Sequence, residues 1–425
     1  MLLRWVIVSD VQYEAARVPG PRGAAADSLP PGLCDGLDEI AAAADDFGHV
    51  THLVPRAVAR PRTAEDIAAL VTSAGDLAVR PRGAGHSVSG QAQCDSGVVC
   101  VTTGLDDVSV EKDRVRAGAG ARWSAVLTAA FERGLTPPVL TDYLELTVGG
   151  TLSAGGVGGS SYRYGPQVDH VHELELVTAD GARISCLPGD KLSDAVLAGQ
   201  GQAGVITSAT MPLVPAPPRV CVAKVVMPSL AALIAAQRQL AREGRVGYLE
   251  GQIAPAESGG WSYLLEAAAF HPADATALGG LEAGPSAEIE EVDYLTFCHR
   301  MTTGSRLLMA TGDWYRPHPW LCVFLPCGAV EQFVADALAE LSVDLLGPIP
   351  MLLDPLRRGP RPAPGLVTPV ADADGLFYLF SILRTVPDTA EAIAAALASN
   401  AALARRAAEM GGSVYPAASI TTLLR

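Results

Sequence analysis

A glycine-spaced turn that leads into a histidine is the first place where this protein could do chemistry. Residues 82–93 have the sequence Arg-Gly-Ala-Gly-His-Ser-Val-Ser-Gly-Gln-Ala-Gln. Gly83 and Gly85 let the backbone turn sharply and leave N–H groups with no side chain in front of them. Successive N–H groups of this kind form a concave anion site. The stretch therefore predicts either a phosphate-binding turn with His86 beside the ligand, or an ordinary turn between strands with His86 on the surface.

A second glycine-rich stretch, residues 140–159, follows an apolar strand further along the sequence. Its residues Thr147, Thr151 and Ser153 place hydroxyl groups beside backbone that a ligand can approach closely. A third glycine-rich segment covers residues 199–207. Three such segments in this part of the protein predict one long ligand that carries phosphate groups.

The elements that must hold these turns follow from capping signals and from the spacing of apolar residues. Thr63, followed by two acidic residues, marks the start of a helix that ends near Gly75. Residues 77–80 form the predicted strand that leads into the first turn. Further strands are predicted at 98–101, 108–115, 172–178, 183–186 and 261–270. Further helices are predicted at 38–44, 123–133, 230–242, 329–341 and 389–410.

Composition limits the class of protein. The sequence has 425 residues, of which 49% are hydrophobic, so two domains with sizeable cores are expected. The net charge of -15 argues against nucleic acid or an anionic membrane as the main partner. The first residues form an apolar run that is short and interrupted by a charge, so neither a signal peptide nor a membrane span is predicted.

Cysteine and histidine spacing gives no sign of a metal site. The eight cysteines are scattered, and none forms a Cys-x-x-Cys pair. Buried, reduced cysteines in a cytoplasmic protein are favoured over disulfides or metal ligands. His170, His172 and His299 lack partners at metal-ligand spacing. We therefore predict a cytoplasmic protein without a metal.

Three stretches carry a family resemblance. Residues 82–92 resemble the Gly-Arg-Gly-His-Ser…Gly-Gln-Ala motif of cytokinin dehydrogenases, which are FAD enzymes of the vanillyl-alcohol-oxidase type. Residues 141–153 are similar to that family's Thr-Asp-Tyr-Leu-x-Leu-Thr-Val-Gly-Gly-Thr-Leu-Ser, and residues 162–167 to its Phe/Tyr-Arg-Tyr-Gly-Pro-Gln. The resemblance is strong from about residue 45 to 218. It continues more weakly at 248–251, 317–321 and 377–378.

The resemblance implies an α+β fold in which a two-part PCMH-type FAD-binding domain carries an α+β substrate cap. The implied divisions are an N-terminal extension at 1–49, the FAD-binding domain at 50–218, the cap at 219–410 and a truncated return segment at 411–425. The family continues beyond this point with a tail that closes over the flavin. Because the sequence ends at Arg425, we expect FAD to bind in a site that is more open to water.

The resemblance also assigns roles to single residues. His86 is implied to carry FAD covalently through the flavin 8α-methyl group. Asp142 is implied to contact both the cofactor and the substrate amine, from which it accepts a hydrogen bond or proton, and Glu266 to bind the purine. The other implied cofactor-binding residues are Gly83, Gly85, Ser87, Gln91, Thr147, Ser153, Val157, Ile206 and Tyr415.

The residues leave alternatives open for several of these roles. His86 could hydrogen-bond to a flavin without a covalent link, and Asp142 could cap a turn. Glu266 alternates in a strand and could be a carboxylate at the rim of the site. A separate group of aromatic residues either walls a flat heterocycle or belongs to the core. This group is Trp314, Tyr315 and Trp320.

Some positions depart from the family pattern. Leu140 replaces a tryptophan, Glu145 replaces a tyrosine, and Cys322 replaces an asparagine after Pro-Trp-Leu. Arg357 stands where the family carries an asparagine, so it could replace a substrate contact. No cysteine lies within 151–159, so a second covalent link to the flavin is not expected.

The activity that the resemblance implies acts on N6-alkenyl adenines. The bond between the N6 nitrogen and the alkenyl carbon would be oxidised to an imine, which hydrolyses to adenine and an aldehyde. The electron acceptor would be a quinone or oxygen. One alternative is a flavin oxidase or cyclase that acts on another small molecule in specialised metabolism. Another is a folded relative that cannot hold the flavin.

Overall fold

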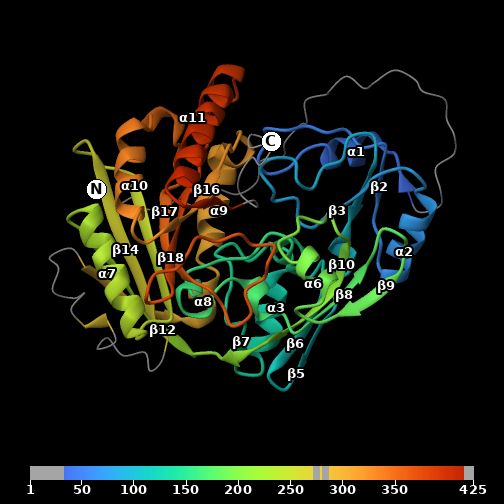
Figure 1. The fold of residues 1–425 in the computed structure, drawn as a ribbon, viewed down its shortest axis with the longest axis horizontal. Helices are drawn as coiled ribbons and strands as arrows, with labels where there is room; N and C mark the ends of the chain where they lie inside the picture. Colours follow the sequence, from blue (N-terminus) through green and yellow to red (C-terminus); the bar gives the residue numbers. More distant parts are fainter. Residues whose placement is uncertain (1–32, 271–277, 280–286, 416–425) are drawn as a thin grey trace.

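The protein was analysed as a computed structural model that describes residues 33–270, 278–279 and 287–415. The N-terminal half carries two sheets, and the C-terminal half carries one large sheet with helices on its outer side (Figure 1). Residues 1–32, most of the predicted N-terminal extension, lie outside the described part of the sequence.

The first sheet delivers the glycine turn. Its strand order is β1-β2-β4-β3, and β2, β4 and β3 run parallel. The bounds are β1 Leu33–Cys34, β2 Ala57–Ala59, β3 Val79–Arg82 and β4 Val98–Val101. Helix α2 (Ala64–Ser73) begins at the predicted cap Thr63, which forms a full capping box with Asp66. Its Ile67 packs under this sheet.

The segment 33–49 is part of this same half. Helix α1 (Leu37–Ala43) follows β1, and β1 pairs with β2. Residues just after α1 then run beside the glycine turn, because Phe47 donates its N–H to the Gly85 carbonyl at 3.0 Å.

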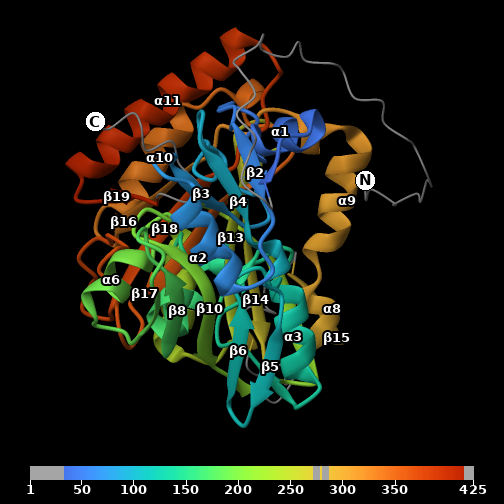
Figure 2. The same ribbon diagram turned by 90° about the vertical axis from the view of Figure 1, so that its right-hand side faces the viewer.

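The second sheet has the order β5-β6-β10-β8-β9 and is antiparallel, and Figure 2 shows β5, β6, β10 and β8 next to one another. The single strand predicted at 108–115 is wrong. This segment forms a hairpin of β5 (Val108–Glu111) and β6 (Arg114–Gly118), because Lys112 adopts a positive φ of 54° and reverses the backbone. The other bounds are β8 Glu173–Val177, β9 Arg183–Cys186 and β10 Val205–Pro212.

Short elements connect these sheets. The helices are α3 Trp123–Phe131, α4 Val148–Leu152, α5 Ser161–Tyr164 and α6 Lys191–Val196, with 3-10 turns at Thr102–Gly104 and Gln167–His170. A two-stranded ribbon of β7 (Leu135–Thr136) and β11 (Val214–Pro215) leads toward the second half.

The C-terminal half is built on an eight-stranded antiparallel sheet with the order β15-β12-β14-β13-β17-β18-β16-β19. The bounds are β12 Arg219–Met227, β13 Tyr248–Pro255, β14 Trp261–Ala269, β15 Ala287–Asp293, β16 Leu321–Pro326, β17 Met351–Arg357, β18 Leu376–Ile382 and β19 Ser413–Val414. Its helices are α7 Leu230–Glu243, α8 Tyr294–Cys298, α9 Met301–Thr311, α10 Val330–Glu340 and α11 Ala390–Glu409, with 3-10 turns at Asp313–Tyr315 and Val343–Leu345.

Period-two alternation decides which face of the large sheet each residue occupies. On β13, Leu249 and Ile253 pack with α7 residues such as Leu233 in the outer core. Tyr248 belongs instead to the core shared with the N-terminal half, and Glu250 lies on its side of the strand. Helices α7, α10 and α11 cover the outer face (Figure 1). The inner face is therefore free to supply polar groups to a site between the halves.

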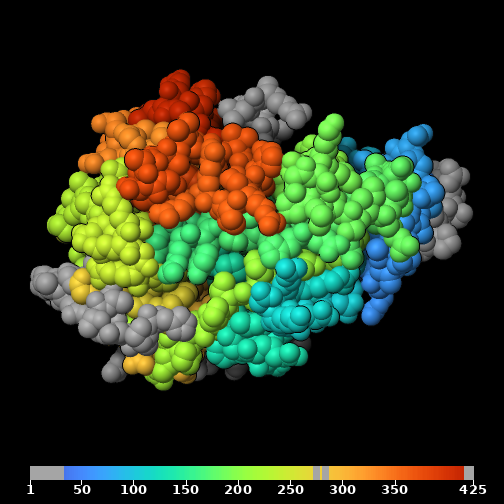
Figure 3. Space-filling model, turned by 60° about the horizontal axis from the view of Figure 1, so that its bottom comes forward, coloured from blue at the N-terminus to red at the C-terminus, as the bar shows by residue number. Residues whose placement is uncertain are grey.

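The loop after β17 also joins the two halves. Asp169 accepts hydrogen bonds from the N–H groups of Gly359 and Ala363 at 2.7 and 2.9 Å. In the space-filling view this loop (orange) lies against the green surface of the N-terminal half (Figure 3). Two buried backbone donors on one carboxylate fix the loop there.

Candidate active site

The glycine turn and the second glycine-rich stretch meet at Gly83. A Cβ atom at this position would lie 2.1 Å from the Thr147 Oγ1 atom, so only glycine fits without a shift. Gly85 adopts a φ of 73°, which glycine reaches without strain. Within the described residues, the N–H groups of Gly85, His86 and Ser87 donate no hydrogen bond. Such free successive donors suit a phosphate-bearing ligand.

A buried aspartate that the sequence analysis did not single out holds this turn in shape. Asp46 is 3% exposed, and its Oδ2 accepts hydrogen bonds from the Ser87 hydroxyl at 2.9 Å and the Gly90 N–H at 2.7 Å. Burial raises the pKa of Asp46. The Ser87 hydroxyl donates to Asp46, and the Gln91 side chain accepts from the Ser89 N–H. Both bonds stabilise the loop.

His86 lies between two aromatic rings. The Phe47 ring stacks on it with centroids 4.0 Å apart, and Tyr143 lies 5.0 Å away on a tilted plane. His318 stacks on Phe47 at 4.3 Å. Burial, with the nearby His318, lowers the pKa of His86 to about 3. The imidazole is therefore neutral at ordinary pH and keeps a lone pair on one ring nitrogen.

Two interpretations were left open for Trp314, Tyr315 and Trp320: either they wall a flat heterocycle or they belong to the core. Two of these side chains lie around His86. Trp314 and Trp320 have ring centroids 5.7 and 6.4 Å from His86, and both also contact Phe47. Tyr315 is 59% exposed. Two of the three rings thus stand at the predicted cofactor attachment point.

The remaining predicted cofactor residues follow helix α4. Thr147 caps it and accepts from the Gly150 N–H, and the Ser153 hydroxyl bonds back to Gly149. Beyond the helix, the Tyr415 hydroxyl accepts from the Gly156 N–H at 3.1 Å. Ile206 belongs to the core cluster beside α4, and Val157 packs against it. The structure therefore brings Gly83 against Thr147 at the start of α4, with Ser153 at its end and Tyr415 bonded just beyond it.

Asp142 lies at the centre of a second cluster. The Arg300 guanidinium donates to its Oδ1 at 2.5 Å, and the Tyr248 hydroxyl donates to the same atom at 2.9 Å. Arg300 also donates to the Tyr248 hydroxyl and lies over the rings of Tyr248 and Phe297, each at 4.6 Å. Two donors on two separate segments thus fix this carboxylate.

The inner face of the large sheet adds more carboxylates to this cluster. Lys224, Glu266 and Glu250 stand directly opposite one another on β12, β14 and β13. Next to them, Asp354 on β17 accepts from the Gly251 N–H. Burial acts against the arginine charge, but Tyr248, Asp142, Glu250 and Glu266 raise the pKa of Arg300 well above its usual value. The cluster is thus a row of buried acids around one guanidinium.

Glu266 is 4% exposed, so it is not a rim carboxylate. Its Oε1 lies 3.6 Å from the Arg300 Nε atom and makes no hydrogen bond within the described residues. Burial raises the pKa of Glu266, although Arg300 and Lys224 oppose that effect. Glu266 therefore faces the Arg300 guanidinium from inside the protein.

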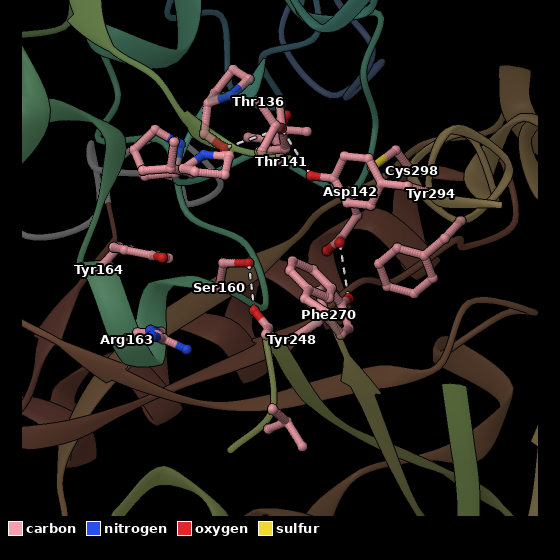
Figure 4. A pocket seen from close by; sticks show the side chains of 18 of the residues that line it. Thr136, Thr141, Asp142, Ser160, Arg163, Tyr164, Tyr248, Phe270, Tyr294 and Cys298 are labelled. Carbon is pink, nitrogen blue, oxygen red and sulfur yellow. Dashed lines mark hydrogen bonds between the residues drawn. The ribbon is translucent and has the colours of Figure 1, made fainter. Parts of the chain in front are cut away.

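A cavity of about 500 Å³ borders this cluster between the two halves. Asp142, Tyr248 and Arg300 are on its wall, and Figure 4 shows the Asp142 and Tyr248 side chains joined by a hydrogen bond. Its flat apolar surface comes from Tyr164, Phe270, Tyr294 and Phe297. The volume lies in the range of small-molecule sites, roughly 300–1,000 Å³. Glu266 is not on the cavity wall.

Three of the positions that depart from the family pattern lie in different parts of the structure. Glu145 pairs with Arg122 at 3.6 Å on the surface, with both side chains more than 40% exposed. Cys322 is buried on the inner face of the large sheet. The buried Nε atom of Arg357 has no hydrogen-bond partner among the described residues.

Comparison with known proteins identifies the class. Residues 55–187 match the family model of an FAD binding domain. Residues 276–415 match the model described as cytokinin dehydrogenase 1, FAD and cytokinin binding. The first match contains the glycine turn and Asp142, and the second contains Arg300 and Asp354. The predicted two-domain α+β architecture is confirmed, and the protein is an FAD-dependent oxidoreductase.

Individual relatives place it more closely. An uncharacterized oxidoreductase, ORF5 in the fasciation locus of Rhodococcoides fascians, is 36% identical over 387 residues, covering 88% of this sequence and 87% of the relative. Cytokinin dehydrogenase 8 of Oryza sativa subsp. indica is 35% identical, covering 82% and 76%. Cytokinin dehydrogenase 1 of Arabidopsis thaliana is 32% identical, covering 83% and 69%. The protein belongs to the cytokinin dehydrogenase family.

Two further observations concern membrane-spanning helices and cysteine pairing. Among the described residues, no helix is both long enough and apolar enough to cross a membrane. All eight cysteines fall in the described part of the sequence and none is disulfide-bonded.

The contact between Gly83 and Thr147 gives a direct test of the cofactor site. We expect Gly83→Ala to bind FAD roughly tenfold more weakly, about 1.4 kcal/mol, because the new methyl group displaces Thr147 and the turn. Titration of apoprotein with FAD measures the change.

Gly304→Ala is the matched control, because nothing lies within 4 Å of its new Cβ. Unchanged FAD binding in Gly83→Ala would contradict the assignment.

Proposed function

We propose that the enzyme oxidises N6-alkenyl adenines at the bond between the N6 nitrogen and the alkenyl carbon, giving an imine that hydrolyses to adenine and an aldehyde. The observation that carries this proposal is Asp142, held by Tyr248 and Arg300 on the wall of the cavity. A fixed carboxylate suits a substrate that must give up an amine proton. The names of the relatives from Oryza and Arabidopsis support the substrate class.

The residues present fit FAD. The turn at Gly83 and Gly85 has no room for side chains and offers free N–H groups. Bound FAD supplies the two-electron acceptor for the carbon next to the nitrogen. Gly83, Gly85, Thr147 and Ser153 would hold its phosphate and flavin parts, with Tyr415 at the far end. Ser87 and Gln91 would act by keeping the loop in shape.

Asp142 would take the proton from the substrate amine. Its carboxylate is oriented by two donors that both reach Oδ1, so Oδ2 is left to face the amine. Glu266 would accept a hydrogen bond from a purine N–H through its unpaired Oε1. Arg300 is on the cavity wall and lies 3.6 Å from this atom, whereas Glu266 is not on the wall, so this contact requires a shift of the arginine side chain.

His86 would attach the flavin covalently. Burial among Phe47 and Tyr143 keeps its imidazole neutral, so one ring nitrogen would hold a lone pair for the bond to the flavin 8α carbon. The electrons would then pass to a quinone or to oxygen.

The role of Asp142 is tested by turnover of isopentenyladenine. Asp142→Asn keeps the shape of the side chain but cannot take a proton, so we expect turnover to fall roughly a hundredfold or more. Flavin content should be unchanged. The product ratio of adenine to aldehyde in the wild type should be one to one.

Glu145→Gln serves as the control for a nearby carboxylate, because Glu145 pairs with Arg122 at the surface. Normal turnover in Asp142→Asn would remove the proposed base. A wild-type enzyme that leaves isopentenyladenine unchanged but oxidises another amine or alcohol would refute the substrate assignment and favour another flavin oxidase.

The covalent link is tested by acid precipitation. We expect the flavin of the wild type to stay with the polypeptide in trichloroacetic acid, and His86→Ala to release all of it. His172→Ala, a histidine outside the turn, should behave like the wild type. Flavin in the supernatant of the wild type would show that the attachment is absent.

A further inference from the structure

Three rings from both halves of the protein stack in a row at the predicted attachment point of the flavin. The centroid of the Phe47 ring lies 4.0 Å from that of His86 at an interplanar angle of 19°, and 4.3 Å from that of His318 at 10°. His86 is on the glycine turn, Phe47 follows α1, and His318 belongs to the C-terminal half. The Phe47 ring is therefore in nearly parallel contact with both imidazoles.

Backbone hydrogen bonds hold Phe47 in this stack. The next residue, Gly48, donates its N–H to the Ser87 carbonyl at 3.1 Å, and its own carbonyl accepts from the His318 N–H at 2.7 Å. A Cβ atom on Gly48 would lie 2.2 Å from the Val88 carbonyl oxygen, so the segment approaches the turn as closely as glycine allows. The segment that carries Phe47 is thus bonded to both halves.

His318 supports the Phe47 ring from the side away from His86. Its side chain is buried, and its ring nitrogens lie 3.2 Å from the Arg384 carbonyl oxygen and 3.3 Å from the Trp314 carbonyl oxygen. Burial lowers the pKa of His318 to about 4, so the ring is neutral and donates to one acceptor at a time. A shift of Phe47 away from His86 would have to displace this buried ring.

The edge of the His86 ring is the part that is left open. The ring lies between those of Phe47 and Tyr143, and the side chain is only partly buried. Within the described residues, neither of its ring nitrogens makes a hydrogen bond. A ligand can therefore meet the nitrogens of His86, while its neighbours cover the faces of the ring.

The plane of the His86 ring needs this support. The terminal torsion of a histidine has broad energy wells, so the backbone of the glycine turn does not fix the plane by itself. No hydrogen bond to a ring nitrogen fixes it within the described residues either. A stacked aromatic ring favours one plane, whereas an aliphatic side chain of similar volume fills the space without doing so.

We propose that Phe47, backed by His318, fixes the plane of the His86 ring so that a nitrogen on its open edge is aligned with the flavin 8α carbon. This inference rests on the covalent attachment proposed above and does not depend on the substrate. Phe47 forms no bond to the flavin and acts through His86, so it is a positioning residue. Alignment of the reacting atoms speeds bond formation, and a ring that is free to rotate loses that advantage.

The attachment step conserves atoms and electrons. The lone pair of one His86 nitrogen forms the bond to the 8α carbon, while one C–H bond of that methyl group and the N–H bond of the imidazole break. Two protons and two electrons thereby pass to the flavin ring system. The quinone or oxygen proposed above as the acceptor removes them, giving hydroquinone or hydrogen peroxide. Phe47 takes part in none of these bond changes, so its loss should slow the step without stopping it.

The test follows flavin attachment with time in full-length protein made in a riboflavin-starved host and then mixed with FAD. Attached flavin is the fraction that stays with the polypeptide in trichloroacetic acid. We expect Phe47→Leu to attach flavin roughly tenfold more slowly, the order of one lost aromatic stack. Phe47→Tyr keeps the ring and should match the wild type, and His318→Leu should slow attachment by less than Phe47→Leu.

Two comparisons separate positioning from a structural role. The double variant His86→Ala/Phe47→Leu should bind FAD as tightly as His86→Ala, because Phe47 acts only through His86. Phe333→Leu is the matched control, since it removes a ring from the outer core, where Phe333 contacts Phe380 at 6.2 Å. Its attachment rate should equal that of the wild type.

Attachment in Phe47→Leu as fast as in the wild type, or slowed equally by Phe333→Leu, would overturn the role of Phe47. Weaker FAD binding in the double variant than in His86→Ala would also overturn it, by showing that Phe47 shapes the turn itself. A wild type that releases all its flavin in acid would refute the attachment and this role together. Failure to oxidise isopentenyladenine would refute only the proposed substrate, because no substrate enters these measurements.

Discussion

The guanidinium of Arg300 is the interaction on which the site depends. Four carboxylates gather on or near the inner face of the large sheet, where burial alone would leave most of them uncharged. One arginine, fixed over two aromatic rings, donates to Asp142 and lies within ion-pair distance of Glu266. It is therefore the cation that lies against these acids, two of which, Glu250 and Glu266, have a pKa raised by burial. The raised pKa of Arg300 follows from the same arrangement, because Tyr248, Asp142, Glu250 and Glu266 all act on its guanidinium.

Much of the fold could be predicted because its signals are local. Caps at Thr63, Ser229 and Thr389 start helices where the sequence places them, and alternation marks most strands. The hairpin at Lys112 could not be predicted because no glycine or asparagine marks the turn in the sequence. The place of residues 33–49 was missed because β1 has two residues and is defined only by its pairing with distant β2. Pairing between distant segments has no local signature.

The site residues also divide into those that local motifs predict and those that they do not. The turn at Gly83 and the stretch around Asp142 carry dense motifs, so their residues could be named from the sequence. Tyr248 and Glu250 alternate like any half-buried strand, and only the register of β13 against β14 makes their face acidic. Arg300 and Asp46 lie in segments without a pattern. Their roles arise from contacts across more than forty positions of sequence, which local spacing does not encode.

The most direct test of this account is the free energy of unfolding of Arg300→Met, alone and with Glu266→Gln. Removing the arginine leaves buried carboxylates without a cation, and we expect a loss of roughly 3 kcal/mol at pH 8. Adding Glu266→Gln removes one of those carboxylates and should recover part of the loss, a coupling that the double-mutant cycle measures. If Arg300→Met is as stable as the wild type, or the second change recovers nothing, Arg300 does not organise the acidic face.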